Sequence, residues 1–218
     1  MIFVCAMTMA QTNAYPLLPM PQNYKVTDKS FAMGKVKLST PVLKSEWEAF
    51  IVNAGGELAD KAAAEIKIEL LPVIDGVKLN PDEAYRLSVS GKLIKIEAVT
   101  ERGVYWALQT LRQLEKKKGK KSLFAGCEIV DWPAFRIRGF MQDVGRSYIS
   151  VEELKREIEI LSRFKINVFH WHLTENQAWR LESKIFPMLN DSINTVRMPG
   201  KYYTFCLLYT SPSPRDTE

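Results

Sequence analysis

IRGFMQDVGR at residues 137–146 and INVFHWHLTE at residues 166–175 are the two stretches that decide the fold of this chain. Each predicts a β-strand, and each ends in a charged residue, Arg146 in the first and Glu175 in the second. The segment between them predicts a helix. We therefore expect a strand–helix–strand unit.

The predicted helix has a defined start and one apolar face. Ser150 and Glu153 have the spacing of a capping box, and Ile149 and Leu154 stand where a hydrophobic staple needs them. A helix of this length that joins two buried strands is a right-handed crossover, so we expect the strands to be parallel. Their polar ends, a guanidinium and a carboxylate, would then share the edge where parallel α/β folds bind ligands. The apolar face recurs at three- and four-residue steps through Val151, Leu154, Ile158, Leu161 and Phe164.

Composition indicates an ordinary globular chain of one large or two small domains, with 218 residues, 46% of them hydrophobic and 25% charged. The net charge of +5 depends on the lysine run at residues 116–121, which we interpret as a solvated helix end and loop. The alternative is a nucleic-acid-binding patch, but no aromatic residues interleave the lysines, so we expect no nucleic-acid partner. Cys5, Cys127 and Cys206 lie too far apart to predict a disulfide or zinc site. No apolar run has the length of a membrane span.

Both ends of the chain differ in character from the rest. Residues 1–14 resemble the back half of a signal peptide, with a plausible cleavage point at Ala10-Gln11, so we expect export to the periplasm, the cell surface or the medium. The alternative is a frayed apolar terminus. Residues 205–218 contain two Ser-Pro steps that oppose a helix, and we interpret them as a foreign tail, with a native disordered terminus as the alternative.

Residues 15–130 predict a supporting α+β domain without catalytic features. Period-two alternation on either side of Ser90-Gly91 predicts a hairpin, and a strand precedes it at 66–71. An apolar stripe over 104–114 predicts a helix that covers this sheet. Asp131-Trp132-Pro133 is the expected domain boundary, because proline stops regular structure.

Two motifs, RGFMQDVGR at 138–146 and HWHLTENQAWR at 170–180, resemble family 20 glycoside hydrolases, the exo-acting β-N-acetylhexosaminidases. YRLSV at 85–89 through GVYWALQTL at 103–111 is similar to that family's N-terminal α+β domain. The resemblance covers about Leu17 to Thr204. It implies an α+β domain followed by the first units of a truncated (β/α)8 TIM barrel, which would occupy residues 131–204.

The resemblance implies that Arg146 and Glu175 bind the hydroxyls of a terminal N-acetylhexosamine, so the expected partners are glycans that end in this sugar. A guanidinium beside a carboxylate can bracket vicinal hydroxyls with charge-assisted hydrogen bonds. The alternative is a plain salt bridge. The chain departs from many family members at Asn176, where a second acidic residue is common, and at Ser147, where histidine is common; the subclass stays open.

Four further residues are expected to support the site. His170 and His172 share one face of their strand, and we interpret them as packed, hydrogen-bonded interior histidines rather than metal ligands, because no partner completes a site. Asp143 would neutralise such a histidine neighbour. Trp179 would either pack under the site or touch the sugar.

The family resemblance implies substrate-assisted retaining hydrolysis, in which the 2-acetamido oxygen attacks the anomeric carbon and an Asp-Glu pair assists. No Asp-Glu dipeptide occurs between Phe135 and Thr204, and Asp82-Glu83 lies in the supporting domain. We therefore expect a truncated exo-β-N-acetylhexosaminidase for terminal GlcNAc or GalNAc, without a catalytic residue, cofactor or activity of its own in this fragment. The alternative is a non-catalytic carbohydrate-binding relative.

Overall fold

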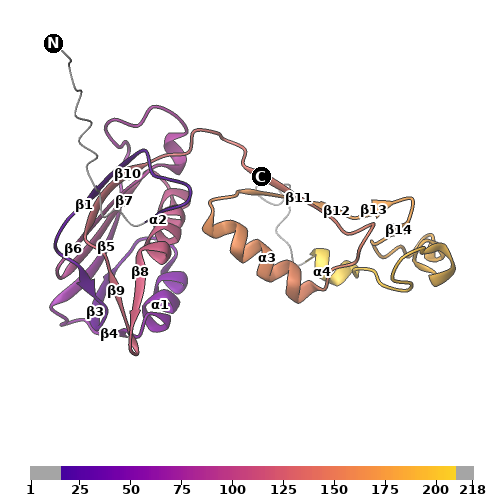
Figure 1. Ribbon diagram of the computed structural model, residues 1–218, viewed down its shortest axis with the longest axis horizontal. Helices are drawn as coiled ribbons and strands as arrows, with labels where there is room; N and C mark the ends of the chain where they lie inside the picture. The colour runs from indigo at the N-terminus through magenta and orange to yellow at the C-terminus, as the bar shows by residue number, and fades with distance from the viewer. Residues whose placement is uncertain (1–15, 210–218) are drawn as a thin grey trace, which may run out of the picture. The chain divides into compact units, whose positions relative to one another are not determined.

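The computed structural model describes residues 16–209, which divide into two compact units (Figure 1). The first unit runs to Arg136 and also includes Arg163–Lys165. The second unit contains Ile137–Ser162 and the chain from Ile166 onward. Within residues 16–209, no helix is both long enough and apolar enough to span a bilayer.

A seven-stranded mixed sheet forms the first unit. The pairs β3–β5, β5–β7 and β3–β4 are parallel, and the other three pairs are antiparallel. The predicted hairpin around Ser90-Gly91 is confirmed as β6 and β7, and Gly91 adopts a positive φ of 47° in its turn. The strand order is β1 (Asn23–Val26), β10 (Cys127–Asp131), β6 (Tyr85–Ser90), β7 (Leu93–Ala98), β5 (Ala64–Leu70), β3 (Lys35–Ser39) and β4 (Glu57–Leu58).

Helices α1 (Lys44–Asn53) and α2 (Glu101–Leu114) lie on one side of this sheet (Figure 1). The predicted apolar stripe of α2 is confirmed, because its members are buried against the inward residues of β6 and β7. Thr100 caps α2 by accepting a hydrogen bond from the Arg102 N–H. The short helix η1 (Pro81–Glu83) precedes β6, and the buried Glu83 carboxylate accepts a 2.6 Å hydrogen bond from Trp106 Nε1. Asp82-Glu83 is therefore part of the structural framework.

The other face of the sheet carries a ladder of alternating charges. The Lys95 ammonium lies 2.6 Å from Glu97 and 3.2 Å from Glu69, and Lys67 and Arg86 extend the ladder on either side. The Lys67 and Lys95 ammoniums lower the pKa of Glu69. Lysines on this face are thus matched by acids on the same or on neighbouring strands.

The lysine run departs from its predicted structure. Helix α2 ends at Leu114, and the lysines lie on a hairpin of β8 (Glu115–Lys118) and β9 (Lys121–Phe124) that pairs with β2 (Phe31–Ala32). The prediction of a helix end was therefore wrong. The residues after α2 are extended because they pair with β9, on which buried Ser122 and Phe124 alternate with more exposed residues, as in a half-buried strand.

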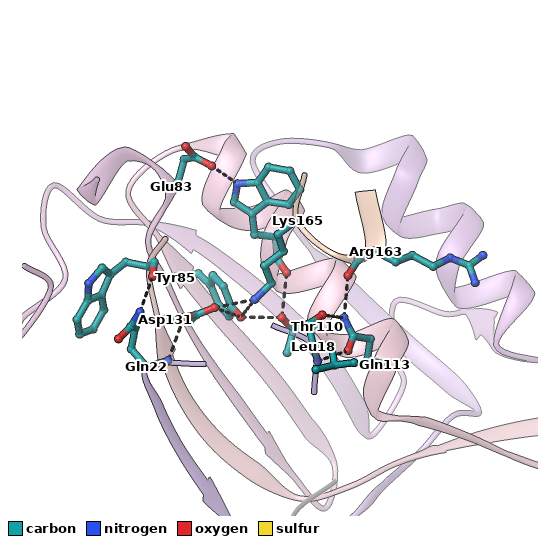
Figure 2. Close-up of polar contacts among 11 residues, drawn as sticks. Leu18, Gln22, Glu83, Tyr85, Thr110, Gln113, Asp131, Arg163 and Lys165 are labelled. Atoms are coloured by element: carbon teal, nitrogen blue, oxygen red, sulfur yellow. Dashed lines mark hydrogen bonds and ion pairs between the residues drawn. The ribbon is translucent and has the colours of Figure 1, made fainter. Parts of the chain in front are cut away.

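A buried polar cluster in the first unit is centred on Lys165 (Figure 2). Its ammonium lies 2.6 Å from Asp131 Oδ2 and 2.9 Å from the Tyr85 hydroxyl. Tyr85 in turn donates to Asp131 and lies 2.6 Å from the Thr110 hydroxyl. Burial raises the pKa of Tyr85, so its hydroxyl keeps its proton. The backbone of Lys165 has a positive φ of 61°, an uncommon conformation that the buried ion pair holds in place.

The second unit contains the predicted strand–helix–strand unit (Figure 1). Strand β11 (Gly139–Asp143) pairs in parallel with β12 (Val168–His172), and α3 (Val151–Arg163) connects them. The capping box is confirmed, because Ser150 Oγ accepts from the Glu153 N–H at 3.2 Å and the Ser150 N–H donates back to the Glu153 carboxylate. Only part of the apolar face of α3 is buried, since a two-stranded sheet is too narrow to cover it and leaves Ile158 exposed.

After β12 the chain forms short elements. These are β13 (Thr174–Glu175), β14 (Ala178–Trp179), η2 (Pro187–Asn190), η3 (Ser192–Asn194) and α4 (Phe205–Tyr209). Residues 205–209 are therefore helical, although a foreign tail without a helix was expected there. The expected signal peptide at 1–14 and the end of the expected tail at 210–218 lie outside the described residues.

We predict that Lys165→Met destabilises the first unit by about 3 kcal/mol, because it leaves the Asp131 carboxylate buried without its cation. Faster hydrogen exchange of the β6 and β10 amides, followed by mass spectrometry, measures this loss. The double variant Lys165→Met/Asp131→Asn removes both charges of this cluster and should recover most of the lost stability. Equal exchange in wild type and Lys165→Met would contradict the prediction.

Candidate functional site

The ends of β11 and β12 bring the two predicted sugar-binding residues together. Because the strands are parallel, Arg146 and Glu175 leave the sheet at the same edge, and Arg146 Nη2 lies 3.6 Å from Glu175 Oε1. The predicted side-by-side placement is confirmed. A separation of 3.6 Å is an ion pair but too long for a hydrogen bond.

Arg146 is held from its other side by Asp143. Arg146 Nε lies 2.9 Å from Asp143 Oδ2, and the Arg146 N–H donates to Asp143 Oδ1 at 3.2 Å. Asp143 was expected to neutralise a neighbouring histidine; its ion pair is with Arg146, and the role beside a histidine stays a prediction. The Arg146 side chain remains 63% exposed, so its guanidinium is oriented by two carboxylates yet accessible to a ligand.

Glu175 is oriented by its own hairpin and lies beside a histidine. Its Oε2 accepts from the Asn176 N–H at 3.2 Å, and its Oε1 lies 3.5 Å from His172 Nε2. The ligand atoms of Asp143, His172 and Glu175 all lie within 4.8 Å of one another, a spacing that a metal ion could use. The Arg146 guanidinium already pairs with both carboxylates, so a cation would compete with an arginine at this position.

Gly145 makes the close approach of the two strand ends possible. A Cβ atom at this position would lie 2.8 Å from Glu175 Cβ and 3.1 Å from the Glu175 nitrogen. Any side chain here would push Glu175 away from Arg146. The predicted site did not include Gly145, although a glycine in or beside a strand is a signal of close backbone approach.

Arg180 is a second residue that the sequence did not reveal. Its side chain is fully buried and donates to five backbone carbonyls, with distances of 2.6 to 3.4 Å. Burial lowers the pKa of the Arg180 guanidinium, which nevertheless stays charged. The interaction ties the end of β11 to the loop before α4. The acceptors are Val144, Gly145, Arg197, Met198 and Lys201.

Tyr203 completes the support under the strand ends. Its ring is stacked on Tyr148 at 4.8 Å and meets Trp171 edge-on at 4.5 Å, and its hydroxyl donates to the Ile149 carbonyl at 2.7 Å. Burial raises the pKa of Tyr203 to about 12, so the hydroxyl remains a donor. The sequence around Tyr203, Gly-Lys-Tyr-Tyr, contains no signal that predicts its packing under the strand ends.

Two supporting residues lie away from the ion-pair cluster. His170 shares a face with His172 but is exposed, so the expectation of an interior histidine was wrong there; the two-stranded sheet leaves this face of β12 uncovered. His172 is half-buried beside Glu175. Trp179 pairs with Thr174 across the β13–β14 hairpin and is 38% exposed, and its role stays a prediction.

Comparison with known families gives matches over both units. The family model described as "Glycosyl hydrolase family 20, domain 2" matches residues 14–132, and "Glycosyl hydrolase family 20, catalytic domain" matches residues 135–210. A β-hexosaminidase from Porphyromonas gingivalis is 33% identical over 92% of this chain and 28% of its own length. A β-hexosaminidase from Vibrio furnissii is 39% identical over 61% of this chain and 21% of its own length.

Solved structures agree with these matches. An exo-β-N-acetylglucosaminidase from Vibrio harveyi, in complex with N-acetylglucosamine, has a TM-score of 0.71 and 32% identity over 88% of this chain and 33% of its own. A β-N-acetylhexosaminidase from Bacteroides fragilis has a TM-score of 0.73 and 27% identity over 88% of this chain and 40% of its own. The chain thus spans well under half the length of these relatives. The expected fold class is confirmed as an α/β domain followed by the start of a catalytic domain.

We predict that Arg180→Met loosens the loop at residues 197–201. Loss of even one charge-assisted hydrogen bond corresponds to roughly a tenfold increase in local opening. Tryptic cleavage after Arg197 and Lys201, timed by mass spectrometry, should accelerate by at least that factor. Arg180→Lys, which keeps the charge but not the five-donor fork, should lie in between. The exposed Arg156→Met on α3 is the control, and equal cleavage in Arg180→Met and this control would refute the structural role.

Proposed function

Because the chain belongs to glycosyl hydrolase family 20, we propose that it supplies part of the sugar-binding wall of an exo-acting β-N-acetylhexosaminidase. The whole protein would remove terminal GlcNAc or GalNAc from glycans. The names of the matched relatives, β-hexosaminidases and an exo-β-N-acetylglucosaminidase, support this assignment.

The observation that carries the proposal is the accessible guanidinium of Arg146 between two carboxylates. Because Arg146 Nη2 and Glu175 Oε1 lie 3.6 Å apart, a sugar hydroxyl can accept from the first and donate to the second. A second hydroxyl on the next ring carbon can use a remaining guanidinium N–H. The two carboxylates accept hydrogen bonds and the guanidinium donates them. This combination suits an uncharged polyol better than an ionic ligand.

The chemistry of the proposed reaction is substrate-assisted retaining hydrolysis. The 2-acetamido oxygen of the bound sugar attacks the anomeric carbon, and an Asp-Glu pair steadies the acetamide and protonates the leaving oxygen. Residues 135–204 contain no such pair. Arg146 and Glu175 would therefore hold the sugar, and the acid would come from another part of the whole protein.

We propose in addition that the whole protein is exported, as the apolar residues 1–14 suggest. Terminal sugars of extracellular glycans would then be its substrates. Detection of the protein in the periplasm, on the cell surface or in the medium supports the idea, and detection solely inside the cell contradicts it.

We predict that, in the whole protein, Arg146→Lys and Glu175→Gln each lower kcat/KM roughly 10- to 100-fold, the loss expected for a charge-assisted hydrogen bond. The assay follows 4-nitrophenol released from 4-nitrophenyl N-acetyl-β-glucosaminide. The control is Arg156→Lys on the exposed side of α3, which should leave kcat/KM unchanged. Full activity in both site variants would remove Arg146 and Glu175 from the binding site.

We predict that the 218-residue chain itself releases no 4-nitrophenol above the uncatalysed rate, because general acid catalysis contributes about 10²- to 10⁴-fold and its residue is missing. The whole protein should release it with retention of configuration, measured by NMR of the first-formed sugar. A whole protein that binds N-acetylglucosamine without hydrolysing the substrate would favour the non-catalytic relative. Turnover by the 218-residue chain would contradict the assignment of the acid to another region.

A further inference from the structure

The tip of the β8–β9 hairpin concentrates positive charge on the first unit. We define the basic hairpin as residues 116–121, in which five of six positions are lysine, all of them exposed. Lys118 and Lys121 lie directly opposite each other in the strand register. Like charges placed across a strand pair destabilise the pair. The hairpin thus carries an electrostatic cost that its own fold does not require.

The basic hairpin is fixed to the end of α1. Lys117 Nζ donates to the Asn53 carbonyl at 3.0 Å and pairs with Glu115 at 2.6 Å, and the Ser122 N–H donates to the Ala54 carbonyl at 3.0 Å. Gly55, with a positive φ of 77°, leaves room for the Lys120 carbonyl where a Cβ atom would clash. The lysine backbones are therefore held in place before any ligand arrives, which lowers the ordering cost of binding.

Within the described part of the chain, Lys118, Lys120 and Lys121 differ from the lysines on the large sheet in their lack of an acidic partner. Across the large sheet, lysines on β1, β3, β5 and β7 lie within 4 Å of a glutamate. Within residues 16–209, Lys118, Lys120 and Lys121 make no ion pair with an acidic side chain. Three ammonium groups at one rigid tip are thus available to an external anion.

We propose that the basic hairpin binds acidic glycans, that is, hexosamine-containing chains that also carry carboxylate or sulfate groups. This inference rests on the proposed function, which makes hexosamine glycans the substrate class. Lysine ammoniums act as compact point charges and suit such repeating anions. The hairpin tip has neither an aromatic residue to stack on bases nor an arginine to read them, which disfavours nucleic acid.

The test is a titration of the chain with chondroitin sulfate of defined length, alongside DNA of matched charge. Lys118→Gln/Lys120→Gln/Lys121→Gln should weaken chondroitin sulfate binding at least tenfold. Lys61→Gln/Lys78→Gln/Lys92→Gln removes the same charge from exposed positions elsewhere in the first unit and should change affinity less than twofold. Equal melting temperatures verify that both triple variants fold. Wild-type affinity should fall roughly tenfold or more between 50 and 200 mM salt, as expected when several ion contacts form.

Three outcomes would overturn the assignment: absence of binding, equal losses in both triple variants, or DNA binding as tight as chondroitin sulfate binding with the same lysine dependence. The titration involves no turnover, so it is independent of hydrolysis. If binding fails while the whole protein hydrolyses the neutral aryl substrate, only the hairpin assignment falls. If hydrolysis fails while binding persists, the proposed function falls.

Discussion

The buried guanidinium of Arg180 is the constraint on which the candidate site depends. Burying a charge is costly unless hydrogen bonds compensate it, and here five backbone carbonyls do so without a carboxylate. Two of these carbonyls belong to Val144 and Gly145, directly before Arg146. The guanidinium therefore fixes the backbone from which Arg146 projects. It also anchors the loop at 197–201 through three of its carbonyls.

Gly145 then allows Glu175 to lie close to Arg146 on this anchored backbone. Since no side chain separates residue 145 from Glu175, the β13 backbone can approach the end of β11 closely. Arg146 and Glu175 reach 3.6 Å without forming a tight hydrogen bond, because Asp143 draws the guanidinium toward its own side. A bidentate, hydrogen-bonded ion pair would use more of the donors and acceptors of both residues. The observed geometry leaves hydrogen-bonding capacity on each residue.

Local signals allowed most of this architecture to be predicted from the sequence. The capping box at Ser150 and Glu153 and the length of the crossover helix were sufficient for the parallel pairing, and the pairing in turn was sufficient for the Arg146–Glu175 contact. Arg180 and Lys165 were missed because a cation gives no local signal of burial; the acceptors of Arg180 lie up to 36 residues away in sequence. The lysine run was assigned to a helix end because its solvent exposure was evident, whereas its strand pairing with β9 depends on Phe124 and Ser122.

The buried charges of Lys165 and Arg180 are compensated by different groups. The Lys165 ammonium is compact and strongly hydrated in water, so its burial needs the full negative charge of Asp131 together with the Tyr85 hydroxyl. The Arg180 charge is delocalised over a planar fork with five donors, so neutral carbonyls suffice. Each unit therefore organises distant chain segments around one long cationic side chain. A lysine at 180 would lack the donors for five carbonyls, and an arginine at 165 would place its larger head group in a site sized for an ammonium 2.6 Å from one oxygen.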